Sequence, residues 1–243
     1  MECCGCPSSI LRNPTVRLRI DPHYLYWAVN LGSVSVPFLL SFENRVQFAQ
    51  KWKAILTGIL GTALLFLVWD AWFTHLGVWG FNADYTLAFR LLGLPLEEVF
   101  FFICIPYACL FSHEVIRYFW PSLKPHAQLS KGVFMLGLFL TILGVLFYER
   151  WYTFLALSGA GVYLISIRKS TFLPAFLKTY LITLLPFFIV NGILTGYFTP
   201  EPVVWYNDAE NLGIRLGTIP VEDLFYGLLM NGLVVRGYEK FKD

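Results

Sequence analysis

Long hydrophobic stretches separated by short polar segments are the dominant pattern of the chain. A stretch of about 18 or more apolar residues is expected to form a membrane-spanning helix. The fifth and seventh stretches are short for a span, and the seventh contains Asn231, for which we expect a hydrogen bond to a neighbouring helix. The seven stretches cover residues 24–42, 54–75, 95–116, 132–149, 151–167, 177–197 and 220–235.

The composition supports a multi-pass integral membrane protein in contact with lipid. Hydrophobic residues make up 57% of the chain and charged residues only 14%, whereas a soluble domain usually carries about 25% charged residues. The net charge of +2 is not gathered into a basic patch with interleaved aromatic residues, so a nucleic-acid partner is not expected. The four histidines include no pair at i, i+4, and Cys3, Cys4 and Cys6 lack a partner cluster, so we expect no metal site.

The distribution of Lys and Arg predicts the orientation. These residues are more numerous in the segments that would share a side of the membrane with the C-terminus. The positive-inside tendency therefore places the C-terminus in the cytoplasm. The N-terminal tail, which holds Arg12, Arg17 and Arg19, would lie on the opposite side, against this tendency.

An internal repeat is visible without any gap. Residues 90–101 read RLLGLPLEEVFF and residues 215–226 read RLGTIPVEDLFY, and a shift of 125 residues superimposes them. With a small slip further upstream, Asp70 in LVWDAW resembles Asn191 in FIVNGI. The shift aligns Asn82 with Asn207, Arg90 with Arg215, Pro95 with Pro220, Glu97 with Glu222, Glu98 with Asp223, and Phe100 with Phe225.

The repeat predicts a topology. The third hydrophobic stretch corresponds to the seventh, and a shift by an even number of helices keeps the direction through the bilayer, so the two repeats are parallel. We expect an all-α membrane protein of about seven transmembrane helices in a 3+1+3 arrangement. Its parts are an N-terminal tail (1–22), a first repeat (23–125), a linking helix (126–149) and a second repeat (150–243). A pseudo-twofold axis along the membrane normal would bring both acidic motifs to the bundle centre.

The acids at the start of the third and seventh helices need an explanation, because an ionised carboxylate in hydrocarbon is costly. Proline followed by acids is also an ordinary helix start. The repetition of the motif, with an arginine at the same distance upstream both times, favours a function. Glu97 and Glu98 point about 100° apart on a helix, so one acid of each pair should face the interior.

Two inward-facing carboxyl groups in a poorly hydrated site would suit proton transfer. If Glu97 and Glu222 face inward, one is expected to stay protonated while the other ionises, which supplies a general acid and a general base. Aromatic faces nearby attract cations, although aromatic residues also fill membrane helices for packing alone. The aromatic candidates near the acids are Phe100, Phe101, Phe225 and Tyr226.

The motifs PLEEVFFF and IPVEDLFY, together with DAW, VNGILTG and WYN, closely resemble the integral-membrane, flavin-independent lycopene cyclase family in its fused two-repeat form. The resemblance covers nearly the whole chain from about residue 24. It implies proton-initiated cyclisation of the linear ends of lycopene, or of a related linear carotenoid, to β-rings without net redox change. No cofactor is implied, and no GxGxxG fingerprint for a flavin or nicotinamide nucleotide occurs.

The resemblance also implies roles for individual residues. Glu97 and Glu222 would transfer the proton at the end group, with Glu98 and Asp223 as partners that set their charge and orientation. A homo-oligomer, or a complex with other enzymes of carotenoid synthesis, is compatible with this family. Binding or support of the substrate would fall to Asp70, Asn82, Asn191, Asn207, Arg90, Arg215, Phe100, Phe101, Phe225 and Tyr226.

Three other functions fit parts of the pattern. A small-solute transporter can be built from a 3+1+3 parallel repeat and can use buried acids for proton coupling, but its site usually lies at the membrane midplane. A cyclase acting on longer carotenoids would share the acidic motifs. A non-catalytic scaffold for a carotenoid pathway would be expected to lose the acids of one motif, and both motifs keep them.

Overall fold

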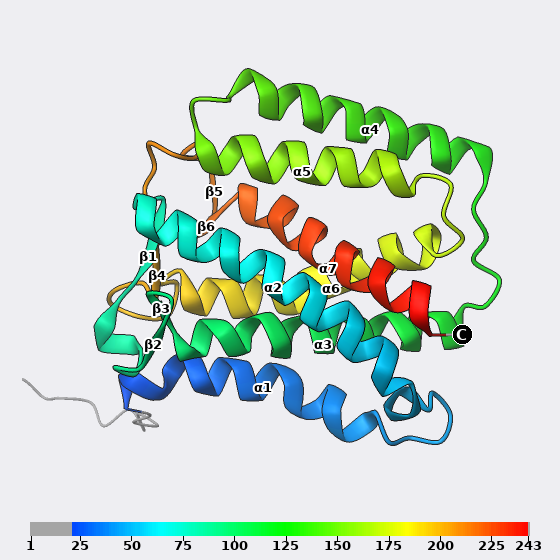
Figure 1. Cartoon of the computed structure of the whole chain (residues 1–243), viewed down its shortest axis with the longest axis horizontal. Coiled ribbons are helices and arrows are strands. Elements are labelled where there is room, and N and C mark those ends of the chain that lie inside the picture. The colour runs from blue at the N-terminus through cyan, green and yellow to red at the C-terminus, as the bar shows by residue number, and fades with distance from the viewer. Residues whose placement is uncertain (1–20, 243) are drawn as a thin grey trace, which may run out of the picture.

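The computed structural model describes residues 21–242, so the cysteine-rich start lies outside the described residues. Seven α-helices run between the same two ends of this described part (Figure 1). Short 3₁₀ turns precede α1 and α2 and follow β1, at Pro22–Tyr24, Phe48–Lys51 and Ala83–Tyr85. The helices are α1 (Leu25–Leu40), α2 (Trp52–Leu76), α3 (Leu96–Phe119), α4 (Ala127–Leu146), α5 (Trp151–Ile167), α6 (Leu173–Leu194) and α7 (Glu222–Phe241).

Each hydrophobic stretch corresponds to one helix, and the largest differences are at polar ends. α4 begins before the predicted residue 132, because the His126 side chain accepts a hydrogen bond from the Leu129 amide (3.1 Å) and caps the helix. α7 continues past residue 235 to Phe241 because its last turns are amphipathic. Tyr238 is fully buried there, and the residues that follow it include the polar Glu239 and Lys240.

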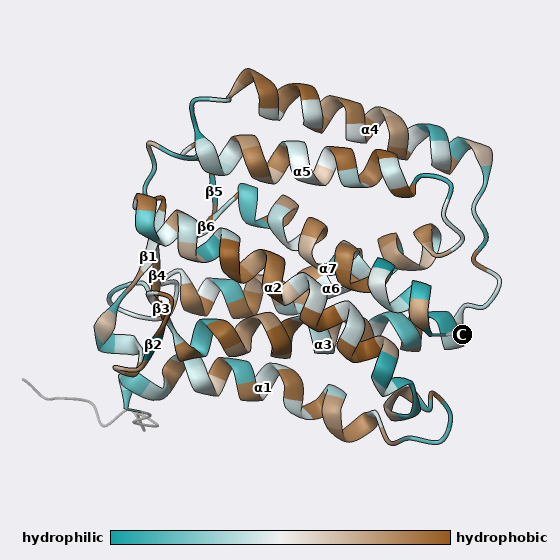
Figure 2. Cartoon of the chain, viewed as in Figure 1, coloured by the Kyte–Doolittle hydropathy of each residue, from teal (hydrophilic) through white to brown (hydrophobic). Residues whose placement is uncertain are grey.

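Four of the described helices are long and apolar enough to cross a membrane. They are Phe48–Leu76, which includes the 3₁₀ turn before α2, and α3, α4 and α6. α1 and α5 have 16 and 17 residues, respectively, which is short for a span. Figure 2 shows hydrophobic residues along the middle of the helices and hydrophilic ones toward the ends and in the loops, as expected for a protein associated with a membrane.

The two repeats pack in a similar way. α1 packs against α3, and α5 packs against α7 in the same manner. The third helix of each repeat also contacts the second helix of the other, so α2 lies beside α7 and α6 beside α3. α3 and α7 contact each other as well, and α4 covers the outside of α5 (Figure 1). The helices that carry the acidic motifs therefore meet in the middle.

A small two-stranded ribbon joins the repeats at the end where α3 and α7 begin. β1 (Trp79–Phe81) pairs antiparallel with β4 (Val204–Tyr206), and Gly80 lies opposite Trp205. These two residues are 125 positions apart, the same shift that relates the repeats. Equivalent positions of the two repeats therefore face each other at the centre of the ribbon, as a twofold axis between the repeats requires.

Backbone bonds and hairpins around the ribbon also occur in matching pairs. The Asn82 amide donates to the Val203 carbonyl and the Asn207 amide to the Val78 carbonyl, each at 2.9 Å. Each repeat then forms a hairpin directly before its acidic helix. One hairpin is β2 (Arg90–Leu91) with β3 (Leu94–Pro95), and the other is β5 (Arg215–Leu216) with β6 (Ile219–Pro220).

The helices α2, α7 and α5 are closely packed through glycines. A Cβ added at Gly58 would lie 2.7 Å from the Val234 carbonyl oxygen, and one added at Gly237 would lie 2.9 Å from the Gly58 Cα. On the other side of α7, the Tyr163 hydroxyl of α5 donates to the Gly232 carbonyl (2.5 Å). Side chains at these glycines would separate the helices, so glycine is needed there for α2, α5 and α7 to pack closely.

Gly58→Ala is expected to destabilise the protein, because the new methyl group meets a backbone atom that cannot rotate away. Overpacking of this kind costs about 1–3 kcal/mol. The melting temperature in detergent should fall. Gly61→Ala on the same helix is the matched control, since nothing lies within 4 Å of its Cβ position. It should leave the melting temperature unchanged or raise it, and an equal drop in both variants would contradict the close-packing argument.

Candidate active site

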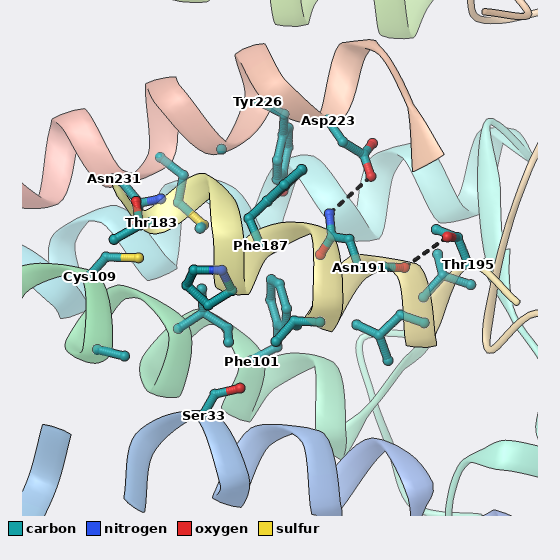
Figure 3. A pocket seen from close by; sticks show the side chains of 18 of the residues that line it. Ser33, Phe101, Cys109, Thr183, Phe187, Asn191, Thr195, Asp223, Tyr226 and Asn231 are labelled. Carbon is teal, nitrogen blue, oxygen red and sulfur yellow. Dashed lines mark hydrogen bonds between the residues drawn. The ribbon is translucent and has the colours of Figure 1, made fainter. Parts of the chain in front are cut away.

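An elongated cavity of about 260 Å³ lies between α1, α3, α6 and α7. Its volume is near the lower end of the roughly 300–1,000 Å³ range of small-molecule sites. Asp70, Glu98 and Asp223 line it near the end where α3 and α7 begin, and most of the remaining wall is apolar or aromatic. Figure 3 shows one of these acids, Asp223, beside Asn191. Acids from both repeats therefore share one hydrophobic chamber.

Glu98 is held from one side only. It is 7% exposed, and the Tyr26 hydroxyl of α1 donates a hydrogen bond to its Oε2. Oε1 has no hydrogen bond among residues 21–242. Because Glu98 lines the cavity, this second oxygen is available to a ligand or to a proton.

Asp223, the aligned residue of the second repeat, is held from several sides. Tyr152 of α5 donates to Oδ1, while Tyr206 (3.0 Å) and Asn191 (3.2 Å) both donate to Oδ2. The bond from Asn191 is drawn in Figure 3. Three donors suit an ionised carboxylate, which has several lone pairs to satisfy. The two aligned acids thus have unequal surroundings.

Tyr206 lies in β4, outside the helices, and whether its hydroxyl keeps its proton decides whether it can donate a hydrogen bond to Asp223. Burial raises the pKa of the Tyr206 hydroxyl well above its usual value, and the charge of Asp223 raises it further. This hydroxyl therefore keeps its proton and remains a hydrogen-bond donor to Asp223.

Asp70 on α2 is the third carboxyl group of the chamber. It is 2% exposed, and its Oδ1 accepts a hydrogen bond from the Trp79 indole N–H (2.5 Å). Its Oδ2 is buried without a partner among the described residues. An unpaired buried oxygen is costly for a carboxylate, so this arrangement suits a protonated group or one that receives a donor from a ligand.

Glu97 and Glu222 lie outside the cavity lining. Both are fully buried, and each accepts a backbone N–H ten residues earlier: Leu87 to Glu97 Oε1 and Leu212 to Glu222 Oε1, both at 2.7 Å. In this arrangement the first acid of each motif fastens the preceding loop onto its helix. The second acid of each motif, rather than the first, faces the chamber. Direct proton transfer by Glu97 and Glu222 thus stays a prediction without a cavity contact to support it.

The other predicted residues divide into two groups. Asp70, Asn191, Phe101 and Tyr226 line the cavity. The side chains of Asn82 and Asn207 instead cap turns, where they accept hydrogen bonds from the backbone N–H groups of Asp84 and Ala209. The residues that lie outside the cavity lining are Asn82, Asn207, Arg90, Arg215, Phe100 and Phe225.

The two arginines belong to the loops. Arg215 bonds to Asp208 (2.5 Å) and to the Thr218 carbonyl (2.9 Å). The hydrogen bond from Arg215 holds the pKa of the exposed Asp208 carboxyl below its usual value. Arg90 is exposed and reaches Thr86 at 3.4 Å. Both arginines precede the acids by the same number of residues because each is the first residue of the hairpin in its repeat.

Four residues that donate hydrogen bonds to the acids of the chamber were not identified from the sequence: Tyr26, Tyr152, Tyr206 and Trp79. Tyr26 and Tyr152 do carry a signal, since they are 126 positions apart, within one residue of the repeat shift. They also make equivalent bonds, to Glu98 and Asp223. Trp79 and Tyr206 are opposite each other in the ribbon, and only the strand pairing brings them beside the acids.

A separate ionic cluster lies at the other end of the bundle. His113 and Glu114 of α3 form pairs there: His113 Nε2 with Glu239 (3.2 Å) and Glu114 with Lys51 (2.5 Å). The carboxylate oxygens and the imidazole also lie close enough together to contact a metal ion. Since Arg117 also bonds to Glu239, both carboxylates already have cationic partners, and the cluster is an ion-pair network.

Fold and site together define a helical membrane protein with a carboxyl-containing, aromatic-walled chamber suited to an apolar ligand. The chain belongs to the lycopene cyclase family, whose model matches residues 23–116 and 149–241, more than half of the chain. Each matched region contains one acidic motif. The unmatched segment between them contains α4.

Two curated fungal proteins show the same relationship. The chain is 22% identical over 261 aligned positions to a bifunctional lycopene cyclase/phytoene synthase of Aspergillus niger, covering 95% of this chain and 41% of that protein. It is 25% identical over 211 positions to one of Podospora anserina, covering 82% of this chain and 33% of that protein. The chain thus spans less than half the length of these relatives. No solved structure matches the chain.

Tyr26→Phe should impair function more than Tyr152→Phe. The first change removes the one hydrogen bond that the Glu98 side chain receives within residues 21–242, whereas Asp223 keeps Tyr206 and Asn191 after the second. A lost bond to a carboxylate costs about 1.5–3 kcal/mol, so we expect a tenfold or larger drop in product formation for Tyr26→Phe. Product measured per amount of folded protein tests this. Equal losses in both variants would contradict the unequal support of the two acids.

Proposed function

We propose that this protein is a carotenoid cyclase that converts the linear ends of lycopene, or of a related linear carotenoid, to β-rings. The reaction is an intramolecular cyclisation of the lyase or isomerase type, without net redox change. The observation that carries the proposal is the meeting of Asp70, Glu98 and Asp223 in one apolar, aromatic-walled cavity. Family membership and the names of both fungal relatives support the same activity.

Glu98 is proposed as the general acid. Its Oε1 has no protein partner among the described residues, and the residue lines the chamber. A carboxyl group with one free oxygen in an apolar setting favours the neutral, proton-carrying form. The proton adds to the terminal double bond of the substrate, and the resulting cation is attacked by a second double bond of the same chain, which closes the ring.

Asp223 is proposed as the base that ends the reaction. Its three donors suit the ionised form, so it can accept the proton lost from the carbon beside the cation when the ring double bond forms. One proton is gained and one is lost, so the product is an isomer of the substrate. Asp70, with its unpartnered Oδ2, is placed to help return the proton to Glu98.

The aromatic wall is proposed to stabilise the cation. Tyr226 lies 5.2 Å from Trp69 and 5.9 Å from Trp79 between ring centroids, so the rings pack against one another around the acids. Aromatic faces attract cations, and by up to about 2 kcal/mol or more when water is absent. They also keep water from adding to the cation.

The membrane arrangement proposed here follows the repeat. All seven helices run between the same two ends (Figure 1), which supports seven spans arranged 3+1+3 with the linking helix at 126–149. The acids then lie at one membrane face, and the C-terminus lies at the other, in the cytoplasm. The substrate would reach the chamber from the surrounding lipid.

A transporter is the rival function. The three carboxyl groups cluster at the strand end of the bundle, whereas carriers usually hold their sites at the midplane. Glu98 and Asp223 also differ in hydrogen bonding, as an acid and a base must, while a symmetric carrier site has no need of that difference. These observations favour the cyclase.

The direct test is expression in a host that accumulates lycopene, followed by chromatography of the pigments. The host without the gene is the baseline, and the retention time and NMR spectrum of the product identify the ring type. Cyclic carotenoids with β-rings are expected. Unchanged lycopene beside well-expressed, membrane-embedded protein would reject the proposal.

A further inference from the structure

The end of the cavity away from the carboxyl groups is unexpectedly polar. Cys109 and Ser112 of α3, Thr183 of α6 and Asn231 of α7 line it. Figure 3 shows Cys109, Thr183 and Asn231 gathered at the end opposite Asp223 and Asn191. A chamber meant only for hydrocarbon would gain nothing from these groups.

Asn231 stands out because its side-chain oxygen is unsatisfied. Ser112 donates to the Ala108 carbonyl (2.8 Å) and Thr183 to the Tyr180 carbonyl (3.0 Å), each within its own helix. The buried Oδ1 of Asn231 has no partner in the described part of the chain. The hydrogen bond to a neighbouring helix expected for Asn231 is thus not formed by this oxygen.

The chemistry of the missing partner can be deduced. An unmade hydrogen bond to a buried polar group costs about 1–3 kcal/mol, so a ligand that supplies the missing partner would bind more tightly. A hydroxyl group both donates and accepts, so it satisfies the amide in either orientation of its oxygen and nitrogen. A carbonyl oxygen only accepts, so it could pair with the amide in only one of these orientations. An alcohol therefore fits best.

The position of Asn231 limits the length of the ligand. Asn231 follows Asp223 by eight residues on α7, which corresponds to about 12 Å along the helix. A molecule with one end among the carboxyl groups would thus place its hydroxyl group about 12 Å away, well short of a full-length carotenoid.

We propose that Asn231, with Thr183 and Cys109, forms a subsite for the hydroxyl group of a shortened linear polyene alcohol whose other end lies at Glu98 and Asp223. This inference rests on the proposed cyclase function and extends its substrate class. The alcohol keeps its oxygen throughout, because protonation, ring closure and proton loss all take place at the opposite end. Full-length carotenoids would use the same acids without a partner for the amide.

Binding to the purified protein in lipid nanodiscs tests the subsite. The probes are a linear apolycopenol with one intact lycopene end group, its methyl ether, and the matching hydrocarbon. Trp79 lines the cavity, so quenching of tryptophan fluorescence reports binding without turnover. The alcohol should bind roughly tenfold more tightly than the ether, equivalent to about 1.4 kcal/mol.

Two variants sharpen the result. Asn231→Leu should reduce alcohol binding to the level of the ether. Ser158→Ala is the matched control, because the Ser158 hydroxyl is also buried without a described partner but lies outside the cavity lining. It should keep the tenfold preference. Thr183→Val, which should weaken the preference, serves as a second variant if Asn231→Leu does not fold.

The outcomes separate this inference from the cyclase proposal. Equal binding of alcohol and ether by wild-type protein that cyclises lycopene would overturn the subsite and leave the proposed function standing. It would indicate that water alone satisfies Asn231. A clear preference for the alcohol, lost in Asn231→Leu, supports the subsite even if lycopene is not cyclised.

Discussion

Glu98→Gln should abolish ring formation, lowering product by at least about 100-fold, the lower limit of what a general acid usually contributes. Glutamine keeps the shape of the side chain and can still accept the Tyr26 hydrogen bond, but it has no acidic proton to give. The measurement is the ratio of cyclic carotenoid to lycopene in a lycopene-accumulating host, corrected for the amount of protein in the membrane fraction.

Glu97→Gln is the informative comparison, because it changes the adjacent residue of the same motif. The amide oxygen of glutamine can still accept the Leu87 N–H, so the loop should remain fastened, and product should exceed that of Glu98→Gln by at least tenfold. If Glu97→Gln is instead inactive in folded protein while Glu98→Gln cyclises normally, the proton comes from the first acid of the motif, as the sequence alone suggested.

Asp223→Asn is expected to have an effect of similar size. Three donors converge on the two oxygens of Asp223. Asparagine would point an NH₂ group at one or two of these donors, so a buried donor would lose its acceptor. The variant also lacks the base that removes the final proton, and product should fall by about 100-fold or more.

The control for this change is Asp208→Asn. Asp208 lies on the exposed loop of the same repeat and pairs with Arg215, and an exposed pair contributes about 0–1 kcal/mol. Its product level should stay within about twofold of wild type, since so small a loss of stability leaves the chamber intact. Normal cyclisation by Asp223→Asn would remove this residue from the proposed mechanism and direct attention to Asp70.

The positions of the helices were predictable because long apolar stretches have few other stable conformations. The acidic motifs were also evident, since their repetition makes them stand out. The orientation of neighbouring acids was not, because Glu97 and Glu98 differ only by a turn of about 100°. Which of them faces the chamber depends on the loop that brings the Leu87 amide to Glu97, and a hydrophobic pattern carries no information about that contact.

The donors around the acids were missed for a related reason. Tyr26 and Tyr152 are single aromatic residues among many, and their importance appears only when α1 and α5 are packed against α3 and α7. Trp79 and Tyr206 depend on strand pairing between segments more than 120 residues apart. Long-range pairing of very short strands leaves almost no trace in sequence periodicity.

The sharing of one chamber by the two repeats has a consequence for the order of events in the proposed reaction. Glu98 of the first repeat and Asp223 of the second line the same chamber between α1, α3, α6 and α7. In the proposed reaction, a carotenoid with two linear ends can therefore present only one of them to the chamber at a time. To acquire rings at both, it must dissociate, reverse and bind again. The singly cyclised compound is then a free intermediate, and its share of the pigment should rise as enzyme becomes scarce relative to substrate.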